Sequence, residues 1–308
     1  MLDQQDTAAR PAPAGEPPAA QVRISVLMPM LNAVRFVDEA IASVVAQSDP
    51  RWELIVVDDG SADGSRAIAE RWARAEPARI RVLQHTDGGT HGSSASRNLA
   101  LSYARGAYVA LLDADDVWQP DHLARLISLL QRFPDAGFAY GPTEDWHGWT
   151  GHPADLARDR VPELRVPHGR LLPPPGPLAE FIRREAPSPC TCSVLMRREL
   201  VQAVGGFEAE FPGMYDDQVL YAKLLLRTPC VVSSACTSRY RRHADSCYST
   251  AKRTGRADAE RVRFLAWLER YAAGHARAEA LEATVARELR LARHPRLAKL
   301  IRALRRRA

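Results

Sequence analysis

The stretch ELIVVDDGS, residues 53–61, decides how the chain folds. Its apolar run is short and continuous, and two carboxylates and a glycine end it. Such a run is typical of a strand that is buried on both faces, as in the middle of a parallel sheet. We therefore expect a strand over residues 53–59 whose carboxyl end carries Asp58 and Asp59.

Three similar runs surround this strand, and stretches of helical periodicity separate them. We expect the other strands over residues 23–29, 80–84 and 108–112. Apolar residues at helical spacing predict helices over residues 36–47, 65–75, 94–104 and 121–132. Alternating strands and helices form a parallel sheet covered by helices, so the expected fold class is α/β. In such open sheets the ligand crevice lies at the carboxyl ends of the strands, where the polar clusters of this chain fall.

The alternation ends near Asp135, and the rest of the chain is less regular. Residues 141–178 are rich in Pro, Gly, Trp and His, as expected for a long loop or lid. Beyond this loop we expect strands over 192–196 and 230–234, and helices over 198–204, 217–226, 261–271 and 276–293. Residues 1–21 form an Ala/Pro-rich polar arm that we expect to be disordered.

The composition predicts a globular chain in a reducing compartment. It has 308 residues, of which 46% are hydrophobic, enough for one large or two small α/β domains. It has no apolar run of 18 residues and no apolar stretch at its start, so neither a transmembrane helix nor a secretory leader is expected. The five cysteines lack zinc-type paired spacing, which favours a cytoplasmic setting. We interpret Cys190 and Cys192 as two buried strand cysteines.

Positive charge is concentrated at the end of the chain. Residues 252–308 hold 16 lysines and arginines against 6 aspartates and glutamates, whereas the rest of the chain is mildly acidic. After Glu288, eight basic residues alternate with leucines, as in a basic amphipathic helix. Such a helix could lie on an anionic membrane or pack on the domain, and both interpretations stay open. No nucleic-acid-binding motif accompanies the charge, so no nucleic-acid partner is expected.

Three acidic clusters fall at the expected crevice edge. They are Asp58-Asp59, Asp113-Ala114-Asp115-Asp116 and Asp216-Asp217. Gathered carboxylates repel one another unless a cation lies between them, and hard divalent ions such as Mg²⁺ and Mn²⁺ prefer oxygen ligands. Because such an ion also binds phosphates, a nucleotide diphosphate is the natural ligand. The alternative, that the aspartates only cap helices or fill turns, suits one cluster better than three.

A series of short motifs runs from Val22 to Ser249. They read SVLMPMLN at 25–32, WELIVVDDGSADGS at 52–65, SRN at 96–98, LDADDVW at 112–118, VGGF at 204–207, YDDQ at 215–218 and RYRRH at 239–243. Each motif is weak alone, but in this order and spacing the chain resembles glycosyltransferase family 2. The resemblance implies the GT-A fold, a Rossmann-like and mostly parallel sheet flanked by helices, followed here by a C-terminal helical extension.

The resemblance also implies a role for each matching residue. The residues expected to bind the nucleotide sugar are Pro29, Leu31, Asn32, Asp58, Asp59 and Asp113. The carboxylates expected at a Mn²⁺ or Mg²⁺ ion are Asp113 and Asp115, the DXD pair, and Asp116, which could share the metal. The expected catalytic residues are Asp217, the general base, and Asp216, which stands where the family normally has glutamate. Leu31 replaces a common aromatic residue, which predicts weaker stacking on the base.

Four further residues each have more than one open interpretation. His243 is a candidate ligand of the metal or of a phosphate, or a structural histidine. Arg97 is expected to face the phosphates of the nucleotide sugar or to tie down the strand ending at Asp113, unless it is a solvated helix arginine. Trp146 and Trp149, near Tyr140, could stack on an acceptor sugar or pack under the long loop.

These expectations divide the chain into four parts. They are a disordered arm (1–21), a nucleotide-sugar-binding half (22–135), an acceptor-binding and catalytic-base half (136–250) and a basic amphipathic tail (251–308). The expected activity is metal-dependent, inverting transfer of a sugar from a nucleotide-diphosphate sugar to a hydroxyl of a glycan, glycolipid or cell-envelope polysaccharide precursor. A lipid-linked acceptor would suit peripheral contact of the tail with the inner face of the cell membrane. The alternative is a non-catalytic nucleotide-sugar-binding or scaffold module of the same fold.

The loop after the first strand argues against two other enzyme classes. A sugar-nucleotide pyrophosphorylase needs a glycine-rich loop with arginine there, and a Rossmann dehydrogenase needs G-x-G-x-x-G. Residues 29–32 read PMLN and contain no glycine. Nothing in the sequence singles out a second carboxylate nucleophile near the sugar, which a retaining double displacement would need.

Overall fold

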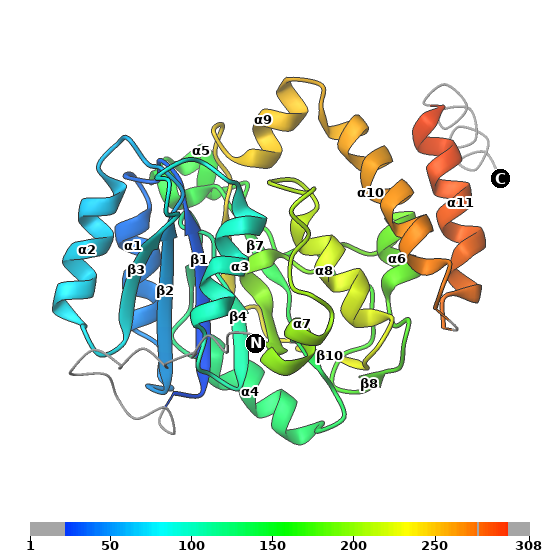
Figure 1. Ribbon diagram of the computed structural model, residues 1–308, viewed down its shortest axis with the longest axis horizontal. Coiled ribbons are helices and arrows are strands. Elements are labelled where there is room, and N and C mark those ends of the chain that lie inside the picture. The colour runs from blue at the N-terminus through cyan, green and yellow to red at the C-terminus, as the bar shows by residue number, and fades with distance from the viewer. Residues whose placement is uncertain (1–21, 276, 295–308) are drawn as a thin grey trace, which may run out of the picture.

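An eight-stranded sheet forms the centre of the protein, in a computed structural model that describes residues 22–275 and 277–294 (Figure 1). The strand order is β3-β2-β1-β4-β9-β6-β10-β8. These strands are β1 (Ile24–Met30), β2 (Trp52–Asp58), β3 (Ile80–Gln84), β4 (Tyr108–Leu111), β6 (Phe138–Tyr140), β8 (Leu171–Leu172), β9 (Val194–Arg197) and β10 (Cys230–Val232). Only β9 and β8 run antiparallel to their neighbours, which confirms the expected mostly parallel α/β sheet.

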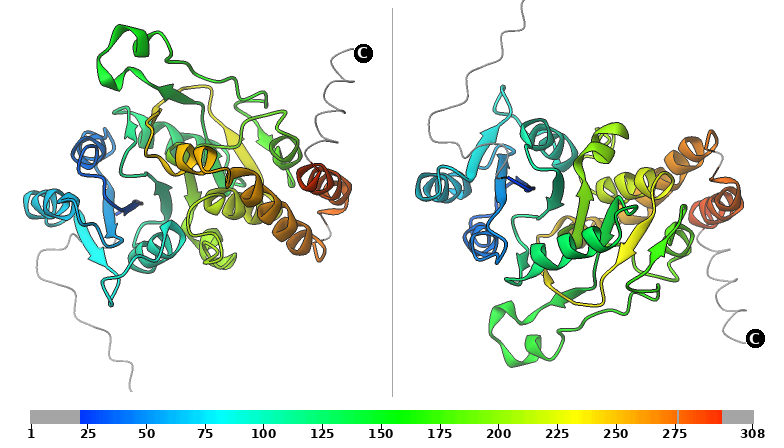
Figure 2. Two further views of the ribbon diagram at one scale, coloured as in Figure 1. Left: turned by 90° about the horizontal axis from the view of Figure 1, so that it is seen from above. Right: turned by 90° about the horizontal axis from the view of Figure 1, so that it is seen from below.

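Helices cover both faces of this sheet (Figure 2). The helices of the described residues are α1 (Val37–Val45), α2 (Ser65–Ala75), α3 (Ser93–Tyr103), α4 (His122–Arg132), α5 (Pro153–Leu156), α6 (Leu178–Arg183), α7 (Arg198–Ala203), α8 (Asp216–Leu225), α9 (Cys247–Arg253), α10 (Ala257–Ala272) and α11 (Glu279–Arg293). Of these, α5 packs on the turn over residues 148–150, and α11 packs on α10 and α6. Alternate residues of β1 enter different cores, because successive side chains of a strand point to opposite faces. Val26 and Met28 belong to the core that includes residues of α1 and α4, whereas Leu27 belongs to the core that includes residues of α3, α8 and α10.

The register of the parallel strands brings three loops to one edge. Met30 lies beside Asp58, and Leu27 lies beside Leu111, the last residue of β4. The segments that follow β1, β2 and β4 therefore leave the sheet side by side. A small second sheet, made of β5 (Val117–Trp118), β11 (Ser238–Arg241) and β7 (Thr143–Trp146), extends this edge.

The second half of the chain departs from the expected elements. The expected long loop over 141–178 contains β7, the 3₁₀ turn η1 (Gly148–Thr150), α5 and β8. The expected strand over 192–196 begins later, because Thr191–Ser193 form a 3₁₀ turn, η2. In that turn the carbonyl of Cys192 accepts a hydrogen bond from Trp118 Nε1 at 2.6 Å, which takes it out of the sheet ladder. The interpretation of Cys190 and Cys192 as two buried strand cysteines is thus wrong, and Cys190 is only half-buried.

The C-terminal helices pack on the body of the protein. Leu281, Val285 and Leu289 are buried on one face of α11, which contacts α10 and α6. Up to residue 294, the apolar face of this helix is therefore buried against the rest of the protein, as the packing interpretation predicts. The arm over 1–21 and the basic residues beyond 294 lie outside the described residues. In the described part of the chain, no helix is both long and apolar enough to span a bilayer.

Candidate active site

A cavity of about 1230 Å³ lies at the carboxyl edge of the sheet. Ten of the twelve residues predicted for the site line it: Pro29, Leu31, Asn32, Asp59, Arg97, Asp113, Asp115, Asp216, Asp217 and His243. The other two, Asp58 and Asp116, are buried but do not line this cavity. The fold thus gathers residues up to 214 positions apart in sequence, from Pro29 to His243, around one space.

The loops after β1 and β2 are locked to each other at one end of the cavity. Asn32 adopts a left-handed backbone conformation with φ of 50°. Its side-chain oxygen accepts a hydrogen bond from Ala62 N at 2.9 Å, and its own N–H donates to Ser61 Oγ at 3.0 Å. Leu31, beside it, is 45% exposed and offers an open apolar surface. This end of the cavity can hold a flat, partly apolar group such as a nucleotide base.

The paired carboxylates after β2 are used in different ways. Asp59 accepts hydrogen bonds from the backbone N–H groups of His91 at 2.8 Å and Gly92 at 2.9 Å, which hold the next loop over the cavity. Asp58 instead accepts from Ser61 N at 3.1 Å and shapes the turn. Adjacent strand residues face opposite ways, so only one member of the pair can turn to the cavity. Asp58 was predicted to bind the nucleotide sugar, but the structure does not bring it there.

Arg97 links two of the acidic clusters beneath the cavity. Its guanidinium, 3% exposed, forms ion pairs with Asp113, at 2.5 Å, and with Asp216. Burial disfavours the charged form, but the two carboxylates outweigh this effect, and the pKa of Arg97 is raised. Of the open interpretations, the structure matches the one in which Arg97 ties down the strand that ends at Asp113. Its charge is used on the protein's own carboxylates.

The two carboxylates at the start of α8 differ in their partners. Asp216 is buried and accepts from both Arg97 and Ser93 Oγ. Asp217 is half-buried, and its donors, Thr191 Oγ1 at 3.2 Å and Gln218 N at 2.7 Å, are uncharged. Burial, followed by the negative charge of Asp216, raises the pKa of Asp217 to about 7. Asp217 can therefore exchange a proton near neutral pH, whereas Asp216 serves to hold Arg97.

A group of oxygen ligands suited to a hard divalent ion follows β4. Asp113, Asp115 and Asp116 each bring one carboxylate oxygen within 4.8 Å of the others. His243 Nε2 lies 2.9 Å from Asp115 Oδ2, and its ring packs against Phe36. Such a set of oxygens, with an imidazole beside them, fits Mn²⁺ or Mg²⁺. One oxygen of Asp116 is already used, because Oδ1 accepts from Arg241 N at 2.8 Å.

The aromatic residues proposed for an acceptor sugar are occupied by packing. Tyr140 is fully buried and stacks on Phe138. The guanidinium of Arg241 lies over the ring of Trp146, 4.4 Å from its centroid. Trp149 packs edge-on against Phe36 and borders a separate hollow of about 520 Å³ beside the main cavity. The packing interpretation therefore describes Tyr140 and Trp146 best.

Two residues that bond to the predicted carboxylates of the cavity were not themselves predicted from the sequence. Thr191 contacts Asp217, and Ser93 contacts Asp216, as described above. Each is more than 25 positions away in the sequence from the aspartate that it contacts, so no local motif marks it. The only signal available beforehand was that Ser93 opens a helix after a polar, glycine-rich loop.

Comparison with known proteins gives a family and related sequences. The family model described as glycosyl transferase family 2 matches residues 25–205. A curated Escherichia coli protein, UDP-Glc:alpha-D-GlcNAc-diphosphoundecaprenol beta-1,3-glucosyltransferase WfgD, is 36% identical over 121 residues, which are 39% of this chain and 46% of that protein. The matches to the curated relatives thus span less than half of those proteins' length.

Two solved structures share the fold. One is S. aureus TarS in complex with UDP-GlcNAc, with a TM-score of 0.69 and 18% identity over 88% of this chain and 72% of that chain. The other is the mannosyltransferase PcManGT from Pyrobaculum calidifontis in complex with GDP-Man and Mn²⁺, with a TM-score of 0.59 and 21% identity over 96% of this chain and 83% of that chain. Both likenesses confirm the expected GT-A architecture.

Proposed function

The chain belongs to glycosyl transferase family 2, and on this basis we propose that it transfers a sugar from a nucleotide-diphosphate donor to a hydroxyl acceptor, with inversion at the anomeric carbon. One observation carries the proposal. The 1230 Å³ cavity joins the carboxylates of Asp113 and Asp115 to Asp217, a carboxyl group whose pKa is raised to about 7. A phosphate-binding ion and a proton acceptor in one cavity are the parts that glycosyl transfer needs.

The donor would lie across the ends of β1, β2 and β4, in the half formed by residues 22–135. Pro29, Leu31 and Asn32 would border the base, and Asp59 would accept from it while it holds the loop at His91. Arg97 would not contact the donor; through its two ion pairs it would hold Asp113 in place relative to Asp216. Its part is positioning, since its guanidinium already has two carboxylate partners.

Asp113 and Asp115 would hold a Mn²⁺ or Mg²⁺ ion, with His243 at its edge, whereas Asp116, which does not line the cavity and whose Oδ1 accepts from Arg241 N, would lie behind the ion. When bound, such an ion neutralises charge on the diphosphate leaving group. The protein's own task there is to keep its carboxylates in place. Arg97 does so for Asp113, and His243 does so for Asp115.

Asp217 would remove the proton from the attacking hydroxyl, in the half formed by residues 136–250. A general base works best when its pKa is near the working pH, and burial gives Asp217 a pKa of about 7. Asp216 is held by Arg97 and Ser93, so the acceptor meets one available carboxylate at this point. A single displacement, which inverts the anomeric centre, fits one such group.

The nature of the acceptor is a second part of the proposal. The name of WfgD gives a diphosphoundecaprenol-linked sugar as that protein's acceptor. We propose an acceptor of a similar class here, a lipid-linked or other precursor of a cell-envelope glycan. The basic end of the chain would then favour the inner face of the cell membrane, with the enzyme in the cytoplasm.

A donor screen tests the proposed activity. The full chain is incubated with UDP-, GDP- and dTDP-sugars and either Mn²⁺ or Mg²⁺, and release of the nucleoside diphosphate is followed. We expect release from one donor class, loss of release on chelation of the metal, and loss in Asp115→Asn. Binding without release in the presence of sugar and lipid-linked acceptors would instead indicate the non-catalytic module. If the folded chain neither binds any of these donors nor releases a nucleoside diphosphate, the proposal as a whole is contradicted.

A further inference from the structure

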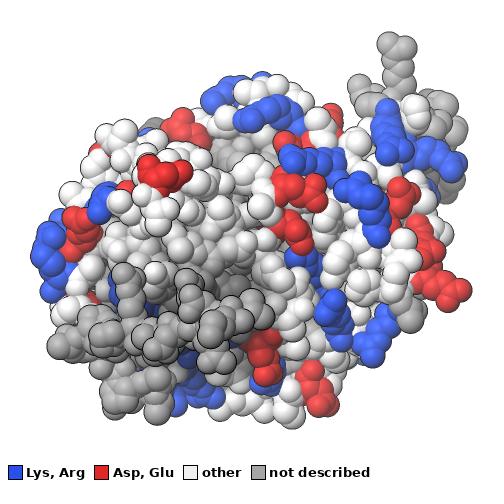
Figure 3. Space-filling model, viewed as in Figure 1, with Lys and Arg blue, Asp and Glu red and all other residues white. Residues whose placement is uncertain are grey.

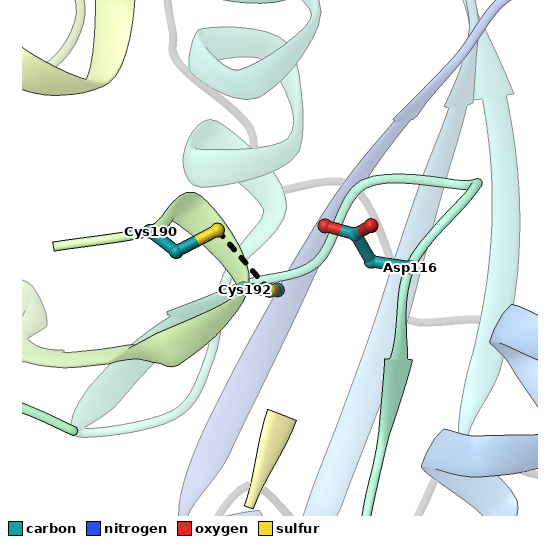
Figure 4. Close-up of side chains that lie close together, drawn as sticks. All are labelled: Asp116, Cys190 and Cys192. Atoms are coloured by element: carbon teal, nitrogen blue, oxygen red, sulfur yellow. Dashed lines mark hydrogen bonds between the residues drawn. The ribbon is translucent and has the colours of Figure 1, made fainter. Parts of the chain in front are cut away.

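A second group of metal-ligating side chains lies behind the first. Asp116, Cys190 and Cys192 each place one ligand atom within 4.8 Å of the others. Figure 4 shows the carboxylate of Asp116, from the segment after β4, facing Cys190, which precedes η2, and Cys192, which lies within it. The two Sγ atoms are 3.5 Å apart, and the thiols are free. The spacing C-x-C gives no sign of this group, because its third member is 74 positions away from Cys190.

The sulfur–sulfur distance suits a shared tetrahedral ion. Zinc–sulfur bonds of about 2.3 Å at a tetrahedral angle place two sulfurs roughly 3.7 Å apart. The observed distance between the two Sγ atoms, 3.5 Å, is close to this value. Two thiolates and a carboxylate are also the ligand types that Zn²⁺ takes, whereas Mg²⁺ and Mn²⁺ prefer oxygen alone.

An unpartnered oxygen of Asp116 is an independent sign of a missing ligand. The side chain is 0% exposed. Oδ1 accepts from Arg241 N, whereas Oδ2 meets no donor at hydrogen-bond geometry among the described residues and has the buried thiol of Cys192 as its neighbour. A buried, unpartnered carboxylate oxygen is costly, and buried polar atoms without a partner are uncommon. A cation bound between Oδ2 and the two thiols would remove that cost.

We propose that Asp116, Cys190 and Cys192 form a binding site for a thiophilic divalent ion of the Zn²⁺ class, separate from the hard-ion site of Asp113 and Asp115. Binding would form two metal–sulfur bonds and one metal–oxygen bond, and the two thiol protons would pass to water. Cys190 is half-buried and lines the main cavity, which gives the ion a path of entry and leaves its fourth position open to water.

The site would act on the neighbouring general base through one residue. Thr191 stands between the two cysteines, and its Oγ1 donates to Asp217 Oδ2 at 3.2 Å. An ion that clamps both cysteines would hold Thr191 against Asp217. This consequence rests on the proposed function, whereas binding of the ion does not.

Cadmium titration of the full chain tests the site directly. The reduced, metal-free protein is titrated with Cd²⁺, whose bonds to thiolate absorb in the ultraviolet. We expect one Cd²⁺ per chain with this absorption, and displacement of it by Zn²⁺. Cys190→Ser, Cys192→Ser and Asp116→Asn should each weaken binding by at least about tenfold, the scale of loss on disturbing a metal site.

Two controls keep the test decisive. Cys247→Ser removes the exposed thiol of the chain's described part and should leave binding unchanged. Mn²⁺ binding, followed by electron paramagnetic resonance, should persist in the two cysteine variants, which shows that they are folded. Absence of the sulfur absorption, its survival in both cysteine variants, or its loss in Cys247→Ser would each overturn the proposal.

Discussion

At the residue scale, the carboxylates of the cavity are set apart by their partners. Asp216 and Asp113 share the buried Arg97, and Asp59 receives two backbone N–H groups. Asp217 has uncharged donors only, and its burial raises its pKa to about 7. A carboxyl group that is partly protonated at neutral pH gives the proposed reaction a characteristic pH dependence.

We expect kcat/KM of the donor reaction to rise with pH and level off above about 7. A general base must be ionised to act. Below the raised pKa of Asp217, about 7, this carboxyl group is protonated and activity should fall. Asp216→Asn removes the neighbouring negative charge and should shift the profile to lower pH. A profile that is flat between about pH 5 and 8, or a shift to higher pH in that variant, would contradict the assignment of Asp217.

Arg97→Met should destabilise the fold by about 3 kcal/mol or more, because it leaves Asp113 and Asp216 without their buried partner. Urea unfolding measures the change. Arg125→Met is the matched control, since its ion pair with Asp121 is about half exposed and should contribute less than about 1 kcal/mol. Similar losses in both variants would mean that Arg97 does not organise the site.

At the element scale, the strands and helices of the first half could be predicted because their sequence signals are local. The runs that become β1, β2 and β4 are mostly apolar, and α1 and α4 show clear helical spacing. The start of β9 could not be predicted, since it depends on the hydrogen bond from Trp118 to Cys192. The two-residue strand β8 likewise depends on a tertiary contact, its pairing with β10.

The candidate site likewise contains residues that the sequence could predict and residues that it could not. Motifs at strand ends located Asp59, Asp113 and Asp115, because the ends of parallel strands meet at one edge, and the motif that opens α8 located Asp217. The sequence could not tell which member of the pair Asp58–Asp59 faces the cavity, since that depends on the orientation of the strand. The meeting of Asp116 with the two cysteines, and of Thr191 with Asp217, follows only from the folded register of η2.

The loop between β3 and α3 depends on the glycine at position 92, which packs closely on Pro212. Gly92 has φ of 89°, and a Cβ there would lie 2.4 Å from Pro212 O. Gly92→Ala should therefore displace the loop, weaken its hydrogen bond to Asp59 and cost about 2 kcal/mol or more of stability.

Gly89→Ala in the same loop is the control for Gly92→Ala. The nearest atoms to a Cβ at Gly89 belong to Asp87 and lie at ordinary contact distance, 3.4 Å, so stability should change by less than about 0.5 kcal/mol. Thermal melting and nucleotide-diphosphate binding are measured for both variants. Equal behaviour of the two would show that close packing on Pro212 does not position the loop.

At the scale of the whole molecule, the end of the chain combines a packed helix with a basic segment. On the face in Figure 3, side chains of both signs are interspersed over α10 and α11. The excess of basic residues after Glu288 belongs mostly to positions beyond 294, outside the described residues. The proposed membrane contact would therefore rest on residues beyond 294, whereas the observed packing involves α11.

Two truncations separate these parts. A chain that ends after residue 294 should keep its melting temperature and lose binding to vesicles that contain anionic lipid. A chain that ends after residue 278 also loses the burial of Leu281, Val285 and Leu289 and should be less stable by about 5 kcal/mol. Equal vesicle binding with and without residues 295–308 would remove the tail from the membrane proposal.

The most direct test of the proposed function is Asp217→Asn, measured with the donor that the wild-type chain uses best. The amide keeps the shape of the side chain but cannot accept the proton, so transfer should fall by roughly 100-fold or more. Calorimetry with the matching nucleoside diphosphate and Mn²⁺ should give an affinity within about threefold of wild type, because Asp59, Asp113 and Asp115 are untouched. Full transfer activity in Asp217→Asn, with the same nucleotide affinity, would contradict the proposed role of this cavity.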